Sequence, residues 1–394
     1  MHRVLARTGT LILIFLAVSH LSSAQSVETI SLEEEPVALQ PATGDIVLHH
    51  LSARGLSLHG QAIYDWSGEI DSASSPHGFG RYSLDFQVPV DVEKLLGWRR
   101  SAGVVRLKHH VQKFGEDCVG EAQLYSNIDA DSRTTLYEAW LEQRWMSERI
   151  RLKGGKIDAN TEFAVVQTAG DFLNASMGYS PTIMAFPTYP EPKVGFIAFL
   201  RPEKRVATGV GVFQTNGMGI LSIVEPGISW KAEPDAWGGR VSGGYWHLSS
   251  RTIPRFDGRY ASGAQGFYSV IEQNIWPRSQ SSAGDRISVF AQLGWAEGSV
   301  SPFTRHAGGG AVLQGPIPSR TKDAFGAATT WVRFSSYTQA GFDHAGEQVF
   351  ETYYKAVISS HVALVQDFQY FHHPGGRRMN PDRPVVTPRL ILSF

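Results

Sequence analysis

The stretch Val105-Arg-Leu-Lys-His-His-Val-Gln112 decides the fold, because apolar and polar residues alternate along it. Residues 137–145, Tyr-Glu-Ala-Trp-Leu-Glu-Gln-Arg-Trp, alternate in the same way. Successive side chains of a β-strand point to opposite faces, so each stretch predicts a strand with two different faces. In the second stretch, Tyr137 falls with Ala139 and Leu141 on one face, and Glu138 falls with Glu142 on the other.

The same alternation recurs along the chain in runs of about 8 to 11 residues that break at Gly, Pro, Asn, Asp or Ser. The further runs are Val206–Thr215, Arg240–Leu248, Phe267–Trp276, Ile287–Ala296, Phe325–Phe334, Val349–Ile358, Val362–Phe371 and Val385–Phe394. Helical periodicity is scarce, which indicates an all-β protein. A soluble β-sandwich or a β-helix is an alternative, but no short repeat is visible and one compact sandwich rarely extends this far.

A transmembrane barrel accounts better for these strands. Its strands have about ten residues each, with apolar side chains toward lipid, polar side chains toward water and no unpaired edge. We predict a transmembrane antiparallel β-barrel of about 16 strands over residues 51–394, although 14 to 18 strands would also fit. The last run ends on the aromatic Phe394, as the final strand of outer-membrane barrels commonly does.

Composition excludes several other classes. The 394 residues include 36 Lys plus Arg against 37 Asp plus Glu, which argues against a polybasic nucleic-acid binder. The hydrophobic content of 42% argues against a disordered chain. A mean hydropathy of −0.16 is too low for a chain that crosses a bilayer many times as helices. The single Cys118 excludes internal disulfides.

The N-terminus has the pattern of a secretory signal. Arg3 and Arg7 precede the apolar run Leu11–Val18, and Ser22-Ser23-Ala24 supplies small residues for cleavage. A membrane anchor is the alternative, but the run is shorter than the roughly 20 residues that span the hydrocarbon. We therefore predict a signal peptide at residues 1–24 and a periplasmic N-terminal segment at residues 25–50.

Charged residues mark the face of the strands that we expect to line the lumen. Arg106 and Lys108 share one side of the first stretch, and Glu138 and Glu142 share one side of the second. A Lys or Arg at mid-depth on the lipid side would cost about 2 to 4 kcal/mol, so the charged sides are expected to face inward. Charges of both signs offer sugar hydroxyls donors and acceptors without holding one charged solute.

The segment after residue 153 supplies further candidates. We expect a β-bulge at Gly154-Gly155 that turns Lys156 and Asp158 toward the lumen, with Asn160 just beyond. The residues from Asn160 to Pro192 contain no long alternating run, and a loop of that length is usually functional. We predict that this loop folds into the pore and narrows it; an outer cover or a loop packed on the wall is the alternative. The rings expected to stack against sugars are Phe163, Phe172 and Tyr189.

Catalytic signatures are missing from the sequence, which has no GxSxG, HExxH or Walker loop. Adjacent histidines occur as His49-His50, His109-His110 and His372-His373, but neighbours in a strand point apart, so a metal would need ligands from distant strands. Glu138 and Glu142 would be about 13 Å apart, beyond the roughly 5 to 9.5 Å that glycosidase carboxylates need, although cross-strand pairs remain open. We expect no enzyme, no metal and no cofactor.

Several longer strings carry a family resemblance. They are Lys156–Ala164, Asp171–Gly178, Phe186–Pro190, Gly308–Ala311, Gly315–Asp323, Glu351–Tyr354, Gln366–Tyr370 and Pro374–Gly376. In this order they resemble the OprB-type carbohydrate-selective porins of Gram-negative bacteria, from about residue 55 to the end. The resemblance implies a 16-stranded outer-membrane barrel that passes sugars, notably glucose, through a constriction of inward-folded loops and charged wall residues.

The resulting hypothesis is a passive channel for small carbohydrates. Its expected partners are small sugars, outer-membrane lipid and the barrel-assembly machinery, with no nucleic acid; monomer and homo-oligomer both remain open. The alternatives are a nonspecific general-diffusion porin and a non-conducting barrel that binds surface polysaccharide. The side chains expected to contact the sugar are Arg106, Lys108, Glu138, Glu142, Lys156, Asp158, Asn160, Phe163, Phe172 and Tyr189.

Overall fold

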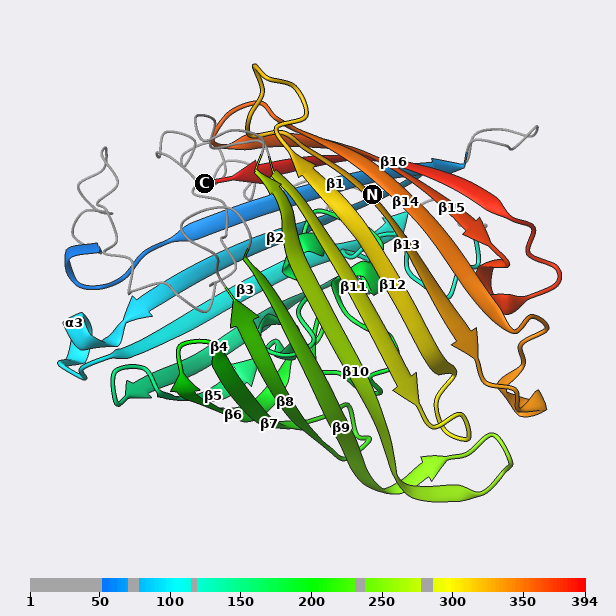
Figure 1. Ribbon diagram of the computed structural model, residues 1–394, viewed down its shortest axis with the longest axis horizontal. Coiled ribbons are helices and arrows are strands. Elements are labelled where there is room, and N and C mark those ends of the chain that lie inside the picture. Colours follow the sequence, from blue (N-terminus) through cyan, green and yellow to red (C-terminus); the bar gives the residue numbers. More distant parts are fainter. Residues whose placement is uncertain (1–51, 70–77, 115–118, 231–237, 278–285) are drawn as a thin grey trace, which may run out of the picture.

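The computed structural model describes residues 52–69, 78–114, 119–230, 238–277 and 286–394. Sixteen antiparallel strands form one closed barrel in which every strand pairs with its neighbours in the chain and β1 pairs with β16 (Figure 1). The predicted all-β barrel with about 16 strands is therefore confirmed. The predicted signal peptide and the segment 25–50 lie outside the described residues.

The strands alternate with short or folded connections. The strands are β1 (His59–Glu69), β2 (Gly78–Asp91), β3 (Ser101–Phe114), β4 (Arg133–Trp145), β5 (Ile150–Ile157), β6 (Lys193–Glu203), β7 (Val206–Gln214), β8 (Ile220–Trp230), β9 (Gly239–Pro254), β10 (Tyr260–Pro277), β11 (Arg286–Ala296), β12 (Phe303–Gln314), β13 (Ala324–Phe334), β14 (Gly346–Val357), β15 (Val362–His372) and β16 (Arg383–Ser393). The helices are α3 (Val92–Leu96) and α4 (Ala175–Gly178), with 3-10 turns η1 (Ala159–Thr161), η2 (Gln167–Ala169), η3 (Thr338–Ala340) and η4 (Pro374–Gly376). Among the described residues, no helix is long and apolar enough to cross a membrane.

The barrel closes at its two terminal strands. Gly60 and Phe394 exchange backbone hydrogen bonds of 2.7 and 2.9 Å, and the ladder continues to Glu69 opposite Val385. The Phe394 ring packs edge-on against Phe86, with centroids 5.9 Å apart. Closure leaves no strand edge unpaired, which is the condition for a sheet inside a lipid bilayer.

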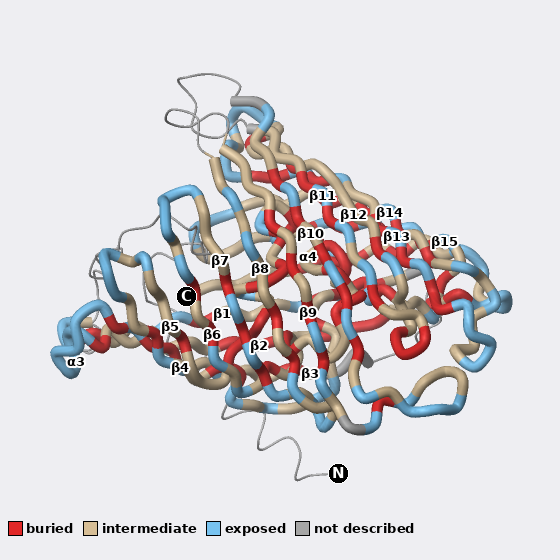
Figure 2. Tube along the Cα trace, turned by 60° about the horizontal axis from the view of Figure 1, so that its bottom comes forward, coloured by how far each residue is buried: buried red, intermediate tan, exposed pale blue. Residues whose placement is uncertain are grey.

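The two faces of the wall differ as the alternation predicts, and Figure 2 shows buried and exposed residues alternating along the strands. Large exposed apolar residues include Leu107, Leu141, Phe196, Val212, Phe267, Leu293, Trp331, Phe350 and Leu364. Buried polar residues include Asp85, Glu138, Glu142, Glu272, Glu351, Asp367 and Arg389. This distribution suits a barrel with hydrocarbon outside and polar groups inside.

One strand departs from simple alternation. Arg106 pairs with Glu138 and Leu107 pairs with Leu136, so Tyr137 is the extra residue of a β-bulge in β4. The prediction that Tyr137 shares the outer face with Leu141 is wrong, because its side chain is 1% exposed and lies inside. The bulge thus places Tyr137 and Glu138 together on the inner wall.

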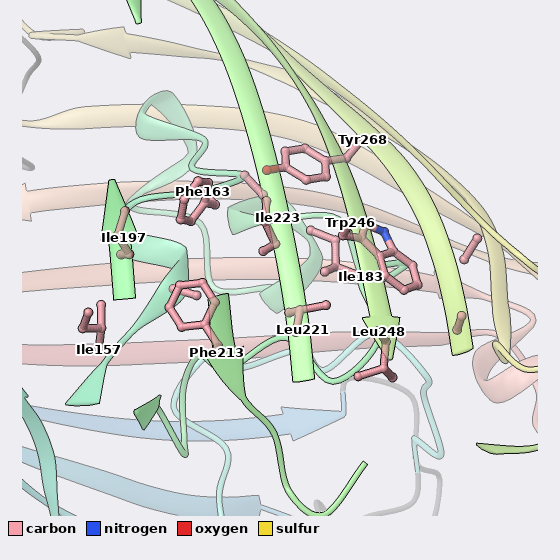
Figure 3. Packing of buried hydrophobic residues seen from close by; sticks show 14 of the residues in the cluster. Ile157, Phe163, Ile183, Ile197, Phe213, Leu221, Ile223, Trp246, Leu248 and Tyr268 are labelled. Carbon is pink, nitrogen blue, oxygen red and sulfur yellow. The ribbon is translucent and has the colours of Figure 1, made fainter. Parts of the chain in front are cut away.

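Two long connections fill much of the interior. Both lie at the end of the barrel opposite the C-terminus, as the strand order requires: residues 119–132 between β3 and β4, and residues 158–192 between β5 and β6. The second packs Phe163 and Ile183 into a buried cluster with wall residues such as Ile197, Ile223 and Trp246 (Figure 3). The predicted inward-folded loop is therefore present inside the barrel.

Candidate functional site

Opposite charges pair along the inner wall of β2, β3 and β4. Arg106 donates from Nε and Nη2 to the two carboxylate oxygens of Asp85, at 2.8 and 2.6 Å, and from Nη1 to Glu138 at 3.1 Å. Lys108 Nζ lies 3.3 Å from Asp85 and 4.2 Å from the centre of the Tyr137 ring. The bidentate geometry and the bulge therefore hold both cations in fixed positions.

A second group of charges continues along β4 and β5. Glu142 accepts from Arg144 at 2.7 Å and from Arg151 at 2.9 Å. Arg151 also donates to Glu162 of the inner loop at 2.6 Å, and Lys153 donates to the same carboxylate at 2.7 Å. We call the nine charged residues of the two groups the charge ladder: Asp85, Arg106, Lys108, Glu138, Glu142, Arg144, Arg151, Lys153 and Glu162.

Glu162 joins the loop to the wall electrostatically. Burial alone would raise the pKa of its carboxyl group, but Lys153 and Arg151 reverse this and lower the pKa from 4.5 to about 2. The pKa in the folded protein is thus below the unfolded value. These ion pairs stabilise the folded loop above about pH 4.5, and their contribution is lost as the pH falls through about 2.

This low pKa predicts that the negative charge of Glu162 persists in acid. We expect the difference in ion selectivity between the wild type and Glu162→Gln to stay constant from about pH 6 to about pH 4, because the wild-type carboxylate remains ionised. Reversal potentials of both proteins in a salt gradient measure that difference. A difference that disappears with a midpoint near pH 4.5 would contradict the assignment, since it would report an ordinary carboxyl group.

A cavity of about 310 Å³ lies beside the ladder. Its wall includes residues close to the turn between β4 and β5, such as Glu148, and the turn between β6 and β7, such as Lys204, so it reaches the end of the barrel that holds the C-terminus. Two aromatic rings also line it, and both carry cations over their faces: Lys153 Nζ is 3.7 Å from the Trp140 ring centre and the Arg151 guanidinium is 4.3 Å from that of Phe199. Phe199 is only 8% exposed and also stacks on Phe163, so a solute in the cavity meets charged donors and acceptors mainly beside the Trp140 ring.

Wall glutamates hold the inner loop in place by accepting backbone N–H groups from it. These bonds join Glu225 to Ala164 at 2.8 Å, Glu272 to Thr168 at 2.5 Å and Glu351 to Leu173 at 2.5 Å. Tyr268 also donates to Glu225, and Arg240 donates to Glu272. The three glutamates come from β8, β10 and β14, so the loop is fixed across the width of the barrel.

The sequence matches the family model "Carbohydrate-selective porin, OprB family" over residues 80–394. The chain belongs to this porin family. Because the match covers most of the chain, it includes β3, β4, β5 and the whole inner loop that build the ladder. A comparison with curated proteins gives no match.

Solved structures agree with the porin fold. The high-pH structure of Pseudomonas putida OprB has a TM-score of 0.79 at 15% identity, covering 88% of this chain and 96% of that one. The low-pH structure of the same protein gives 0.60 at 16% identity, covering 88% and 94%. A loop L8 deletion mutant of OmpT from Vibrio cholerae gives 0.54 at 8% identity, covering 86% and 99%. At these identities the likeness concerns the fold alone.

The structure brings four of the predicted site residues of this porin together. Arg106, Lys108, Glu138 and Glu142 all face inward along β3 and β4. Asp158 and Asn160 lie at the start of the inner loop, where Asp158 accepts from the Asn160 backbone N–H at 3.0 Å and from the Tyr137 hydroxyl. This pair shapes the turn by which the porin's loop leaves the wall.

Lys156 faces the opposite way. Its register with β4 and β6 is continuous through Gly154 and Gly155, so the expected bulge is absent and the prediction of a lumen-facing Lys156 is wrong. Alternation puts Lys156 on the side of Leu152, and Lys153 on the inner side. Lys156 Nζ instead donates to the carbonyl of Leu136 at 2.6 Å.

Two of the three predicted stacking rings are inaccessible. Phe163 is 0% exposed and packs on Phe199 and Phe213, while Phe172 is 1% exposed and packs on Phe290 and Tyr353. The prediction that these two rings stack against sugars is wrong, because they serve as hydrophobic anchors of the loop. A phenylalanine in a long irregular loop carries no signal that separates these roles.

Tyr189 is partly buried beside the ladder. Its hydroxyl donates to the Ile128 carbonyl at 2.8 Å, and Lys108 Nζ lies 5.0 Å from its ring centre. The aromatic residues that do line the cavity, Trp140 and Phe199, were not selected from the sequence. Trp140 is two residues from both Glu138 and Glu142 in the same strand, and this shared face was the available signal for its inward position.

Proposed function

We propose that this chain is a passive diffusion channel for small carbohydrates of the glucose type across the bacterial outer membrane. The observation that carries the proposal is the charge ladder beside the open cavity. Paired charges of both signs present many donors and acceptors to hydroxyl groups, while their mutual ion pairs limit the hold on a single charged solute.

Transport proceeds by exchange of contacts. A sugar gives up hydrogen bonds to water and takes up weak hydrogen bonds to ladder groups such as Arg106 and Glu142, while its apolar face passes Trp140. Each contact is weak enough to break, because tight binding would slow release. No chemical step occurs, and no cofactor takes part.

We also propose a route by which the protein reaches the outer membrane. Residues 1–24 direct export and are removed, residues 25–50 remain on the periplasmic side, and the barrel-assembly machinery inserts residues 51–394. Barrels of this class have short periplasmic turns and longer external loops, so the end that holds the C-terminus faces the periplasm. The inner loop then enters the pore from the outside.

Planar-bilayer conductance with a panel of sugars as blockers tests the function. We expect single channels whose current is reduced by glucose and sugars of similar size in a concentration-dependent manner. Equal passage of glucose, amino acids and salts of similar size in liposome swelling would show that the channel is a general-diffusion porin without carbohydrate selectivity. A protein that forms no channel but is retained on glycan columns would instead be a polysaccharide-binding barrel.

Substitutions of Arg106 and Lys156 test the ladder directly. We expect Arg106→Ala to change glucose block by about fivefold or more, because the charge-assisted bonds to Asp85 and Glu138 are lost. Lys156→Ala should leave the block unchanged, since Lys156 lies on the outer side of β5. Heat-modifiable migration of both variants in gels controls for assembly. Equal effects of the two substitutions on block would show that the ladder does not contact sugar.

A further inference from the structure

Two arginines lie next to each other on the outer face of the barrel, where apolar residues otherwise dominate. Arg305 near the start of β12 and Arg333 near the end of β13 are directly opposite each other in the antiparallel ladder. Their chain neighbours His306 and Val332 are buried inside, so alternation turns both arginines outward, and both are exposed. Their Cβ atoms are within about 5.5 Å of each other, as for any directly opposed pair.

This arrangement is unfavourable without an anion. Like charges directly opposite each other destabilise a strand pair. Within the described residues, neither arginine forms an ion pair, and carboxylates of the adjoining loops are engaged elsewhere: Glu297 accepts from Ser299 at 2.6 Å and Asp343 accepts from the Arg378 backbone N–H at 3.0 Å. The two guanidinium groups are therefore available to a ligand from outside the chain.

The pair lies at the level of a membrane interface. Arg305 is opposite the exposed Trp295 in the ladder of β11 and β12, and the exposed Trp331 lies two residues before Arg333 on the same face. Tryptophan rings of this kind mark the interface between lipid and water. The end concerned is opposite the C-terminus, so in the outer membrane it belongs to the outer leaflet.

A strip of small side chains runs from the arginines toward the middle of the wall. The outer face of β12 carries Ala307, Gly309 and Ala311, while Leu293 of β11 and Trp331 of β13 are both opposite Ala307 and exposed. β11, β12 and β13 lie side by side (Figure 1). Farther along the wall, Gly309 is opposite Ala291 and Thr329, and Ala311 is opposite Val289 and Ala327, so the outer face below the arginine pair carries mostly small residues.

We propose that Arg305 and Arg333 bind a phosphate group of an outer-leaflet glycolipid whose acyl chains lie along the outer face of β12. Guanidinium groups recognise phosphate oxygens through two parallel hydrogen bonds, which suits a pair of arginines better than a single charge would. The strip of small residues alone would not identify a ligand; the opposed cations above it do. The proposal rests on the outer-membrane location and is independent of what the pore conducts.

Native mass spectrometry of the full-length protein in detergent tests the site, with bisphosphorylated lipid A as the probe. We expect the wild type to bind lipid A, and the double variant Arg305→Gln/Arg333→Gln to bind about tenfold or more weakly. The control Arg99→Gln/Arg149→Gln removes two exposed arginines at the other end of the barrel and should bind as the wild type does. Glucose flux should be unchanged in both, which shows that the channel is intact.

Other outcomes overturn the proposal. Equal binding of dephosphorylated lipid A would exclude phosphate recognition, and displacement by inorganic phosphate at equal concentration would show a general anion site in place of a lipid site. Unchanged lipid A binding by Arg305→Gln/Arg333→Gln would remove the arginines from the site. Loss of self-association by that variant, with lipid binding retained, would assign the face to a second copy of the chain.

Discussion

Glu351→Ala is expected to open the channel. The Glu351 carboxylate accepts the backbone N–H groups of Leu173 at 2.5 Å and Asn174 at 3.2 Å, and both loop residues are buried. Without the carboxylate, two buried donors lose their acceptor at a cost of about 1 to 3 kcal/mol each. This cost applies only while the inner loop stays docked on the wall. Detachment of the loop therefore becomes at least about tenfold more frequent.

Single-channel recording measures this effect as wide openings, and liposome swelling measures it as faster entry of a trisaccharide than in the wild type. The barrel itself should survive, because the strand ladders do not use the Glu351 side chain. Glu351→Gln is the matched control, since its remaining carbonyl oxygen can still accept from the loop. Wild-type conductance of Glu351→Ala would mean that the hydrophobic anchors Phe163 and Phe172 suffice to hold the loop.

The strands could be predicted because their signal is local. The run Ile287–Ala296 became β11 (Arg286–Ala296) and Phe325–Phe334 became β13 (Ala324–Phe334), since alternation along ten residues reports directly on two different solvents. The alternation did not predict β12. Its centre, His306-Ala-Gly-Gly-Gly310, has too few side chains to alternate, and only pairing with both neighbours defines it as a strand.

The site was less predictable because its partners come from distant parts of the chain. The alternation of side chains placed Arg106 and Glu142 on the inner wall. It could not show the Tyr137 bulge or the continuous register through Gly154 and Gly155, because both depend on the neighbouring strands. Glu162 lies in an irregular loop, where no alternation of side chains assigns a residue to one face. Its importance follows only from its contacts with Arg151 and Lys153.

Those contacts make the double variant Glu142→Gln/Glu162→Gln the strongest test of the ladder. It removes two negative charges that lie within 3 Å of Arg144, Arg151 or Lys153. Arg151 and Lys153 thereby lose their carboxylate partners beside the cavity, whereas Arg144 keeps Glu148. At about 4 Å each unit charge changes the energy of a passing ion by about 1 kcal/mol even with the screening of bulk water. Two charges therefore shift anion over cation permeability by about tenfold or more.

Reversal potentials in a potassium chloride gradient measure that ratio, while glucose flux should change less because glucose carries no charge. Glu203→Gln is the matched control: the residue is exposed at the same end of the barrel and does not line the cavity. A ratio unchanged from the wild type would mean that ions avoid the ladder, and the sugar path would then have to be sought elsewhere in the barrel. A shift in the double variant, with none in Glu203→Gln, would place the permeating ions beside Arg151 and Lys153, where the proposed sugar path also runs.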